Sequence, residues 1–520
     1  YVDDDAPNDT GDGSIARPKK YITSAIQLMN GGDTLIIKDG VYTGQKNMIG
    51  DYASPQIYPP SGLGPNQYTV IKAENIGGAI IDGEYQRTAF STANRIAKVN
   101  YMHIEGIHFR RGSCGVFNIR GDYNKIIRSG FEDGIPPGTT RECEIASIQG
   151  GSSYSLVEDI WAWGRGRYGF YSSSTDGGTN HIIFRRVVVR TDDTPSGFVS
   201  GGINFYKGDT NVCQNCMVID STPNASSIHH GALYMVGNTW IAPNNSYYGS
   251  IVLNNDYWYG FMPEDSRQTS TLKNVIIWDG GKAGFEMTPT DQGTMDVSHV
   301  TLGRNTGNGF RSNNGYNLTE NIANSISVNN SSYGFREIDK IDTVNVYGNV
   351  SGACDNCAIT TGITTNPFTA APGYSSPALK YLPRIEANSN LKGAATDGGD
   401  IGATILKKIG VSRTLYGEPG WDQTTNEDLW PWPDEDIWTP KLRAYNASGP
   451  GGNRGFAANG TGLYGGPITL TSYIWEYLGN PCPAEICGSK GSPTITITQP
   501  TTSSTYSTKD SKVTLSGTAT

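Results

Sequence analysis

The sequence is poor in charge and in the residue types that build helices. Charged residues make up 17% of the 520 positions, whereas an ordinary globular protein has roughly 25%. Together with 66 Gly and 29 Tyr, this composition excludes a helix bundle. No run approaches 18 apolar residues, so the sequence predicts no membrane-spanning helix. The formal net charge of −9 has the wrong sign for a nucleic-acid-binding protein.

Cysteine is also scarce, but its even number predicts disulfides formed in an oxidising compartment. The chain begins at Tyr1 rather than Met, which we interpret as a mature, secreted protein. The two CxxC pairs lie far apart, which disfavours a four-thiolate zinc site without excluding it, and neither is followed by the His of a haem-attachment motif. The eight positions are Cys114, Cys143, Cys213, Cys216, Cys354, Cys357, Cys482 and Cys487.

A row of Gly residues, each followed by an apolar residue, recurs along the middle of the chain. After a first gap of 54 residues, which corresponds to two turns, the spacing settles at 24 to 33 residues. A period of this length indicates a solenoid whose units stack on one another. The row consists of Gly115, Gly169, Gly202, Gly231, Gly260, Gly284, Gly309 and Gly334.

A second row, upstream of most of these glycines, has apolar residues at positions one, four and six of each unit, for example Leu272, Val275 and Ile277. Positions four and six share one face of a strand, and position one lies across a bend. Units of about 25 to 30 residues with short strands and polar corners predict an all-β fold, a right-handed parallel β-helix. We expect ten or eleven turns between about residues 35 and 350.

Several polar residues fit the corners and inner positions of this repeat. Asn residues just after the second row favour left-handed corners or a stacked amide ladder. Cys213 and Cys216 fall on inward positions and form a local disulfide or pack as small apolar groups. Cys114 and Cys143 are about one turn apart, so they could bridge neighbouring coils. The corner residues are Asn254, Asn255, Asn305, Asn329 and Asn330.

Both ends of the repeat carry features of a cap. Residues 19–30 predict a short amphipathic helix, followed by a Gly-Gly turn and a strand from Thr34 to Ile37. With the opening YVDDDAPNDTGDGS and the closing DGGDIGA at 397–403, residues 1–405 resemble the pectate-lyase-like parallel β-helix superfamily. The resemblance implies a secreted β-helix domain with an N-terminal cap, and it says little about activity.

The repeat ends near residue 405. Residues 406–489 contain Trp430, Trp432, Trp438 and Trp475, which predict an extension packed on the end or flank of the rod. Residues 490–520 are rich in Thr and Ser and resemble the first strands of a bacterial immunoglobulin-like domain. Because roughly 30 residues cannot fold alone, we expect that the native chain continues or that this segment pairs with a partner's sheet.

Outward side chains beside the Gly row are rich in rings and cations. Rings stack on sugar C–H surfaces, and cations bind uronate or sulfate groups, so this strip predicts binding of an anionic polysaccharide or cell-surface glycan. The competing interpretation is that the aromatic residues pack beneath long loops. The predicted substrate-binding residues are Tyr168, Tyr171, His229, Trp258, Glu286 and Arg336.

A polysaccharide lyase needs a group that neutralises the uronate carboxylate and a base that removes the neighbouring C5 proton. We predict Lys282 and His230 as bases, Arg167 and Arg311 as neutralising groups, and Tyr259 as proton donor. His229 and His230 fit a turn pair equally well, and Lys282 fits a solvated corner. No complete lyase motif is present, which counts against this assignment.

An acidic run at the N-terminus predicts a structural calcium site, because calcium prefers clustered oxygen ligands. The candidate ligands are Asp3, Asp5, Asp9 and Asp12. Openings of this superfamily are commonly acidic without being catalytic.

Two other functions fit the same repeat. A glycoside hydrolase needs a pair of carboxylates, for which Glu158/Asp159 and Asp192/Asp193 are candidates. The polygalacturonase pattern is missing, so the hydrolase ranks below the lyase. A non-enzymatic surface, adhesin or filament subunit is the second alternative, with self-assembly through residues 491–520.

Overall fold

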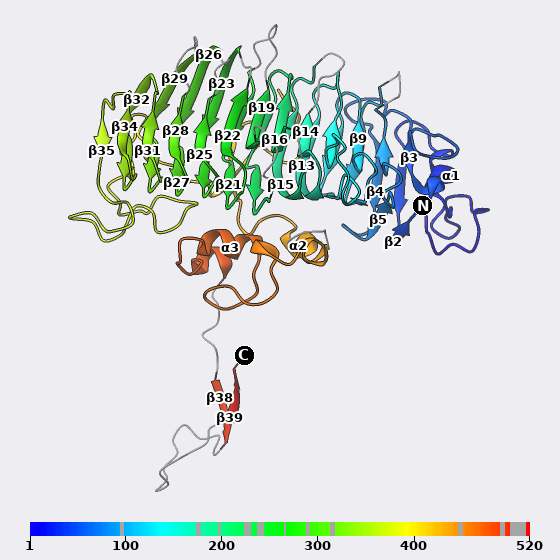
Figure 1. The fold of residues 1–520 in the computed structure, drawn as a ribbon. Coiled ribbons are helices and arrows are strands. Elements are labelled where there is room, and N and C mark those ends of the chain that lie inside the picture. The colour runs from blue at the N-terminus through cyan, green and yellow to red at the C-terminus, as the bar shows by residue number, and fades with distance from the viewer. Residues whose placement is uncertain are drawn as a thin grey trace.

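Each coil of the chain contributes up to three short strands, and equivalent strands of successive coils pair in parallel (Figure 1). The computed structural model describes residues 1–93, 98–172, 178–195, 199–222, 230–236, 244–264, 267–287, 292–312, 318–445, 451–488, 495–499 and 516–519. Of residues 230, 267, 268, 292, 318, 495–499 and 516–519, only the backbone is described. Among these residues, no helix has the length and apolar character needed to cross a membrane.

The strands form three walls of a right-handed parallel β-helix. Wall 1 contains β1 (Thr34–Ile37), β4 (Thr69–Ala73), β7 (Met102–Glu105), β10 (Lys125–Ile127), β17 (Val212–Gln214), β20 (Ser246–Tyr248), β23 (Arg267–Lys273), β26 (Gln292–Ser298), β29 (Leu318–Ala323) and β32 (Lys340–Asp342). Wall 2 contains β2 (Gly40–Tyr42), β5 (Ala79–Asp82), β8 (His108–Arg110), β11 (Gly130–Glu132), β18 (Met217–Ile219), β21 (Ile251–Leu253), β24 (Ile276–Trp278), β27 (Thr301–Gly303), β30 (Ile326–Val328), β33 (Val344–Tyr347) and β35 (Gly362–Ile363). Two long strands, β13 (Leu156–Arg165) and β15 (Ile183–Asp193), run through both walls.

Wall 3 is a separate 12-stranded sheet, so the described chain makes one or two more coils than the period predicts. Its strands are β3 (Ile49–Gly50), β6 (Phe90–Ser91), β9 (Phe117–Ile119), β12 (Ala146–Ile148), β14 (Tyr168–Ser172), β16 (Ser200–Tyr206), β19 (His230–Val236), β22 (Tyr259–Glu264), β25 (Ala283–Glu286), β28 (Asn308–Arg311), β31 (Tyr333–Arg336) and β34 (Gly352–Asp355).

In the coils where the Gly row is in register, the apolar residue after the Gly points into the rod. Phe261, Phe285, Phe310 and Phe335 are fully buried, and their rings follow one another at 5.3, 5.6 and 5.1 Å between centroids. The preceding Gly lies where the backbone of the next coil is close. A Cβ added at Gly309 would lie 2.6 Å from the carbonyl oxygen of Gly334 and 2.1 Å from Ser327 Oγ, which is too close for any side chain.

Two members of the predicted Gly row are out of register. Gly231 pairs with Gly201, so it lies one residue before the position that Gly202 occupies. Phe117 aligns with Phe170 through Ala146, so Gly115 likewise lies one residue before the position that Gly169 occupies. In those coils Ala232 and Val116 occupy the position that Gly has elsewhere, where the next coil is close. The spacing was misread there because Gly is frequent enough in this chain to occur by chance beside the structural position.

The Asn corners are as predicted. Asn254 and Asn329 have left-handed backbones, with φ of 50° and 53°. Asn305 donates its amide to Asn330 at 2.8 Å, and Asn330 donates to Asn349 at 2.8 Å, which is an amide ladder running along the rod.

The ends and the disulfides complete the rod. The predicted N-terminal helix is short, α1 (Ile22–Ile26), and a 3-10 turn η1 (Gln45–Asn47) packs beside it. Cys114–Cys143 bridges neighbouring coils, and Cys213–Cys216 is a local, buried disulfide. Cys354–Cys357 and Cys482–Cys487 are also paired, and no cysteine is free.

The chain after the last coil returns along the rod. Residues 395–434, which we call the C-terminal arm, contain the hairpin β36 (Lys407–Ile409) and β37 (Thr424–Asp428). The arm hydrogen-bonds to residues at the corner between walls 1 and 2, for example Thr396 to Asn324, Thr404 to Asn274 and Ile409 to Asn215. The arm therefore covers this corner over several coils.

The extension that follows the arm packs on the flank of the rod, below wall 2 in Figure 1. It contains α2 (Glu435–Ala444), the 3-10 turn η2 (Gly455–Ala457), α3 (Leu470–Glu476) and α4 (Ala484–Cys487). Its Trp438 and Trp475, together with Trp430 and Trp432 at the end of the arm, are buried against Trp161, Trp163 and Trp278 of the rod. The last two strands, β38 (Ile495–Gln499) and β39 (Ser516–Ala519), form only a two-stranded antiparallel sheet, which does not establish an immunoglobulin-like domain.

Candidate functional site

One column of outward side chains runs along wall 3 and contains four of the predicted site residues, Tyr171, Glu286, Arg311 and Arg336. The strand register stacks each member on the equivalent residue of the next coil, about 4.8 Å away. We call it the wall-3 column. From the N-terminal side it consists of Tyr171, Asn204, Tyr234, Met262, Glu286, Arg311, Arg336 and Asp355.

Glu286 is the buried carboxylate of this column. Its side chain is 6% exposed, and Oε1 lies 3.0 Å from Nη1 of Arg311 on the next coil. Burial raises the pKa of the Glu286 carboxyl to about 7, although the charges of Arg311 and Arg336 act in the opposite direction. A carboxyl with this pKa exchanges protons readily near neutral pH.

Tyr259 lies on the coil before Glu286, close enough for the charges of Glu286 and Arg311 to act on it. It starts β22 and is the strand partner of Ala283, whose own strand ends at Glu286. Burial, followed by the negative charge of Glu286, raises the pKa of the Tyr259 phenol, so the hydroxyl keeps its proton at neutral pH. Tyr259, Glu286 and the two arginines are thus a proton donor, a proton acceptor and two cations on adjacent coils.

Several polar groups of the wall-3 column are buried without a hydrogen-bond partner in the described part of the chain. They are both amide atoms of Asn204, which is fully buried, together with Oε2 of Glu286 and Nε of Arg311. Buried polar groups are normally paired, and leaving one unpaired costs about 1–3 kcal/mol. Such atoms also occur elsewhere in the described residues, but on this column they lie beside two partly exposed arginines, where a polar ligand could supply the missing partners.

The aromatic residues at the N-terminal end of the predicted strip are buried. Tyr168 and Tyr171 stack at 4.8 Å between ring centroids and are 2% and 9% exposed, in a cluster with Tyr234 and Met262. The prediction that they stack on sugar rings needs open faces, and the structure instead buries both rings against each other and their neighbours. Arg167 lies over the Tyr168 ring at 4.9 Å and donates from Nε to the carbonyl of Val199.

Two other predicted residues lie at the corner that precedes wall 3. Nζ of Lys282 is 3.7 Å from the centroid of the Trp258 ring, and Trp258 in turn contacts Tyr259 at 6.5 Å between centroids. Lys282 is therefore next to the site but not beside Glu286. His229 lies outside the described residues, and only the backbone of His230 is described, so the predicted roles of both stay predictions.

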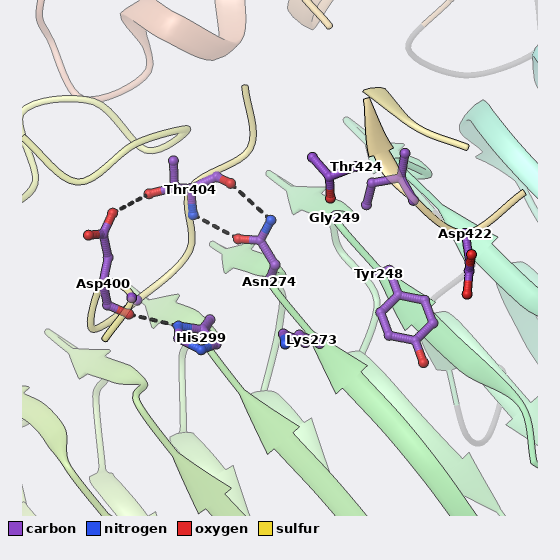
Figure 2. A pocket seen from close by; sticks show the side chains of 12 residues that line it. Tyr248, Gly249, Lys273, Asn274, His299, Asp400, Thr404, Asp422 and Thr424 are labelled. Atoms are coloured by element: carbon purple, nitrogen blue, oxygen red, sulfur yellow. Dashed lines mark hydrogen bonds between the residues drawn. The ribbon is translucent and has the colours of Figure 1, made fainter. Parts of the chain in front are cut away.

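A cavity of about 380 Å³ opens between wall 1 and the C-terminal arm (Figure 2). His299 in this cavity is within 2.7 Å of the Asp400 carbonyl through Nδ1 and within 2.9 Å of Asp397 through Nε2. Asn274 exchanges two hydrogen bonds with the backbone of Thr404. Since these groups already pair with each other, the cavity is a weaker candidate than the wall-3 column.

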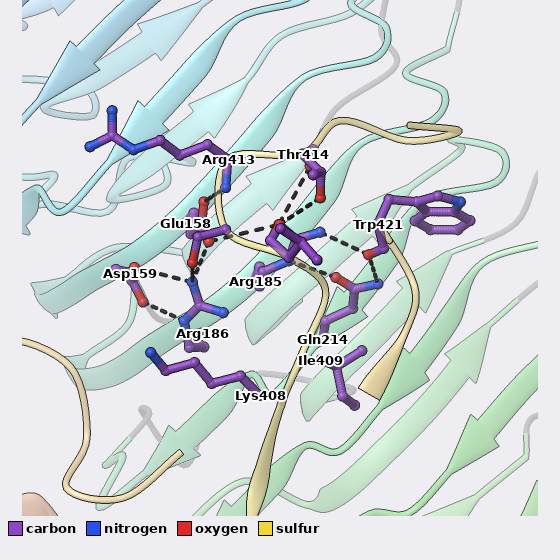
Figure 3. A network of polar contacts seen from close by, with 12 residues as sticks. Glu158, Asp159, Arg185, Arg186, Gln214, Lys408, Ile409, Arg413, Thr414 and Trp421 are labelled. Carbon is purple, nitrogen blue, oxygen red and sulfur yellow. Dashed lines mark hydrogen bonds and ion pairs between the residues drawn. The ribbon is translucent and has the colours of Figure 1, made fainter. Parts of the chain in front are cut away.

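The acid pairs that were candidates for a hydrolase bind arginines. Glu158 and Asp159 both contact Arg186, which is fully buried, and Glu158 also accepts from the backbone of Arg413 (Figure 3). Asp192 pairs with Arg190 at 2.9 Å and with Arg454 of the extension at 2.6 Å. These carboxylates hold the arm and the extension on the rod.

The N-terminal aspartates do not gather at one point. Asp9 accepts from Ser24 and from the backbone of Lys20 and Tyr21, and Asp12 faces Arg17 at 3.4 Å. The carboxylates that do approach one another are those of Asp3, Asp4 and Asp5, and Asp3 already pairs with Lys38 at 3.0 Å. Calcium binding stays a prediction, and it concerns this smaller group.

Comparison with known proteins gives structural similarity only. No protein-family model and no curated protein matches the chain. Among solved structures, pectate lyase Pel9A is 15% identical over 77% of this chain and 94% of its own, with a TM-score of 0.48. A rhamnogalacturonan lyase is 12% identical over 76% and 96%, with a TM-score of 0.39. The GH87 alpha-1,3-glucanase from Streptomyces thermodiastaticus strain HF3-3 is 11% identical over 69% and 68%, with a TM-score of 0.37. At such low identity these similarities concern the β-helix, and we take no residue role from them.

Proposed function

We propose that the protein is a secreted polysaccharide lyase that binds a uronate-containing chain on wall 3 and cleaves it by β-elimination. The observation that carries the proposal is Glu286, a buried carboxyl with a pKa near 7 beside two arginines, whose second oxygen has no partner among the described residues. Four disulfides support export, since disulfides persist in oxidising compartments.

The two arginines have the charge that this reaction needs. Arg311 and Arg336 are about one-third exposed, so a sugar carboxylate can reach them. Their positive charge would neutralise the uronate carboxylate and so acidify the proton on C5. Glu286 pairs with Arg311 and Asp355 pairs with Arg336 at 3.3 Å, so these four groups carry no net charge and a sugar carboxylate would share the two arginines with them.

The proton transfers follow from the two pKa shifts. Ionised Glu286 removes the C5 proton, the C4–C5 double bond forms, and the bond from C4 to the glycosidic oxygen breaks. Tyr259 donates its proton to that oxygen, and both side chains then exchange protons with water. A raised pKa makes Glu286 a stronger base than an ordinary carboxylate and keeps Tyr259 protonated until the leaving group forms.

Ultraviolet absorbance of unsaturated sugar ends tests the proposal. Pectate, alginate and glycosaminoglycans are incubated with the wild type and with Arg311→Gln. We expect absorbance to grow with at least one polymer and to be strongly reduced in the variant. No signal with any of these polymers, or an equal signal from Arg311→Gln, would remove the basis for the lyase.

A further inference from the structure

A second pocket lies at the corner between walls 2 and 3, next to the proposed active site. It has a volume of about 530 Å³. Three successive coils line it, and the extension supplies Tyr477, the residue that follows α3. The pocket is therefore built jointly by the rod and the extension.

The pocket is lined by aromatic rings and by equal numbers of positive and negative side chains. Lys282 lies over Trp258, and Arg304 pairs with Asp279 at 3.2 Å. Tyr477 donates its hydroxyl to Asp279 at 2.8 Å, which fixes this carboxylate against the extension. Asp256, which is exposed, is the second acid in the lining.

Two cations and two carboxylates leave the pocket without net charge. It therefore has no excess positive charge that would attract a uronate. Two aromatic rings together with acidic, basic, amide and hydroxyl groups are suited to a ring with several hydroxyls, which needs both donors and acceptors. An uncharged sugar has this chemistry.

The pocket and the wall-3 column are aligned along one strand. Lys282 directly precedes β25, which ends at Glu286, and four residues at about 3.3 Å each span about 13 Å. Trp258 similarly precedes Tyr259. A polysaccharide that lies along β25 would place one sugar beside Glu286 and a different sugar in the pocket.

We infer that the corner pocket binds an uncharged sugar of the same chain, so that the substrate is a heteropolysaccharide in which uronate and neutral sugars occur together. This inference rests on the proposed function for the position of the uronate. Tyr477 acts as a positioning residue, because it holds Asp279 and through it Arg304.

Binding measurements in the Glu286→Gln background test the inference without any cleavage. Isothermal titration calorimetry compares tetrasaccharides from gellan and from rhamnogalacturonan, which mix uronate with neutral sugars, with a tetragalacturonate. We expect Trp258→Ala to weaken binding of at least one mixed tetrasaccharide about tenfold, because it loses a buried aromatic contact, and to change tetragalacturonate binding by less than about twofold. Tyr477→Phe, which keeps the ring, should weaken the mixed ligand by a smaller factor. Lys273→Gln, an exposed lysine in the cavity beside the arm, is the matched control and should change neither.

The outcomes separate the two proposals. Equal weakening of both kinds of ligand by Trp258→Ala, or no effect of Trp258→Ala and Tyr477→Phe on any mixed ligand, overturns the inference. Should Trp258→Ala fail to fold, as judged by its thermal melt, Tyr477→Phe alone decides between these results. If the pocket variants act as expected but the wild type produces no unsaturated ends, the neutral-sugar pocket stands and the lyase activity falls.

Discussion

The corner under the C-terminal arm and the outer face of wall 3 both carry buried charged residues in ion pairs, but only the first uses them to join distant segments of the chain. Glu158, Asp159 and Arg186 lie between the rod and the arm, where Arg185 also donates to carbonyls of the arm (Figure 3). On wall 3, Glu286 keeps one oxygen unpaired within the described residues, and Asn204 keeps both amide atoms unpaired. Charge at the arm corner therefore holds segments together, and charge on wall 3 is available to a ligand.

We expect the largest difference between the two regions in catalytic rate. Glu286→Gln removes the proposed base while keeping the shape of the side chain, and a general base contributes about 10²–10⁴ in rate. We expect kcat on the cleaved polymer to fall by that factor, with Tm nearly unchanged or higher. Glu427→Gln, an exposed glutamate of the arm that pairs with Lys408, is the control and should keep full activity. A Glu286→Gln variant with wild-type kcat would show that the charge on wall 3, like that at the arm corner, has no catalytic role.

The arm corner should respond in stability instead. Arg186→Met leaves Glu158 buried without its main partner, and breaking a buried ion pair costs about 3–5 kcal/mol. Chemical denaturation should show this loss, while kcat per folded molecule stays unchanged. Arg413→Gln is matched to it, because Arg413 pairs with Glu105 but is half exposed, and it should cost less than about 1 kcal/mol. Equal losses in both variants would show that the arm does not depend on the buried network.

The pH dependence of stability sharpens the contrast. Burial raises the pKa of Glu286 from 4.5 to about 7, so the folded state binds its proton more tightly than the unfolded state does. The stabilisation is complete below pH 4.5 and is lost as the pH rises through 7. At about 1.4 kcal/mol per pKa unit, roughly 3 kcal/mol should separate the two limits. The difference in unfolding free energy between wild type and Glu286→Gln, measured at pH 4.5 and pH 8, isolates this group, because other buried acids contribute to both proteins. A difference that does not change with pH would contradict the assigned pKa.

The smallest effect concerns the unpaired amide. Asn204→Leu removes two buried atoms without partners, so we expect the protein to gain about 1 kcal/mol while its affinity for substrate falls. Asn305→Leu should have the opposite effect on stability, because the Asn305 amide belongs to the ladder and also accepts from the backbone of Gly280. Destabilisation of Asn204→Leu by as much as Asn305→Leu would mean that Asn204 is structural.

The sequence predicts the rod well because the repeat is local. The second apolar row and the Asn corners follow from strand periodicity and left-handed turns, and the structure confirms the corners and the row up to Leu302. The predicted unit Ala323, Ile326 and Val328 is wrong by one residue, because Ile322 is the inward residue there and Ile326 and Val328 face the arm and the extension. The Gly row gives the period but misses the register at Gly115 and Gly231, since spacing alone does not distinguish a structural Gly from its neighbour.

The site is harder to predict from the sequence, because it depends on contacts between distant residues. Strand alternation places Glu286, Arg311 and Arg336 on one outward column, and the register confirms this placement. Periodicity does not reveal that Tyr168 and Tyr171 are buried, or that the arm returns over more than 200 residues to pair with Glu158. Asn204 and Glu286 stand out because some of their polar atoms have no partner among the described residues, and the order of residues in the sequence does not reveal this.

The most direct test of the central claim is the structure of Glu286→Gln with a bound uronate-containing tetrasaccharide. We predict that a sugar carboxylate lies within hydrogen-bonding distance of Arg311 or Arg336, with the glycosidic oxygen beside Tyr259. An oligosaccharide bound instead in the cavity lined by Tyr248 and His299, with the outer face of wall 3 empty, would contradict the account.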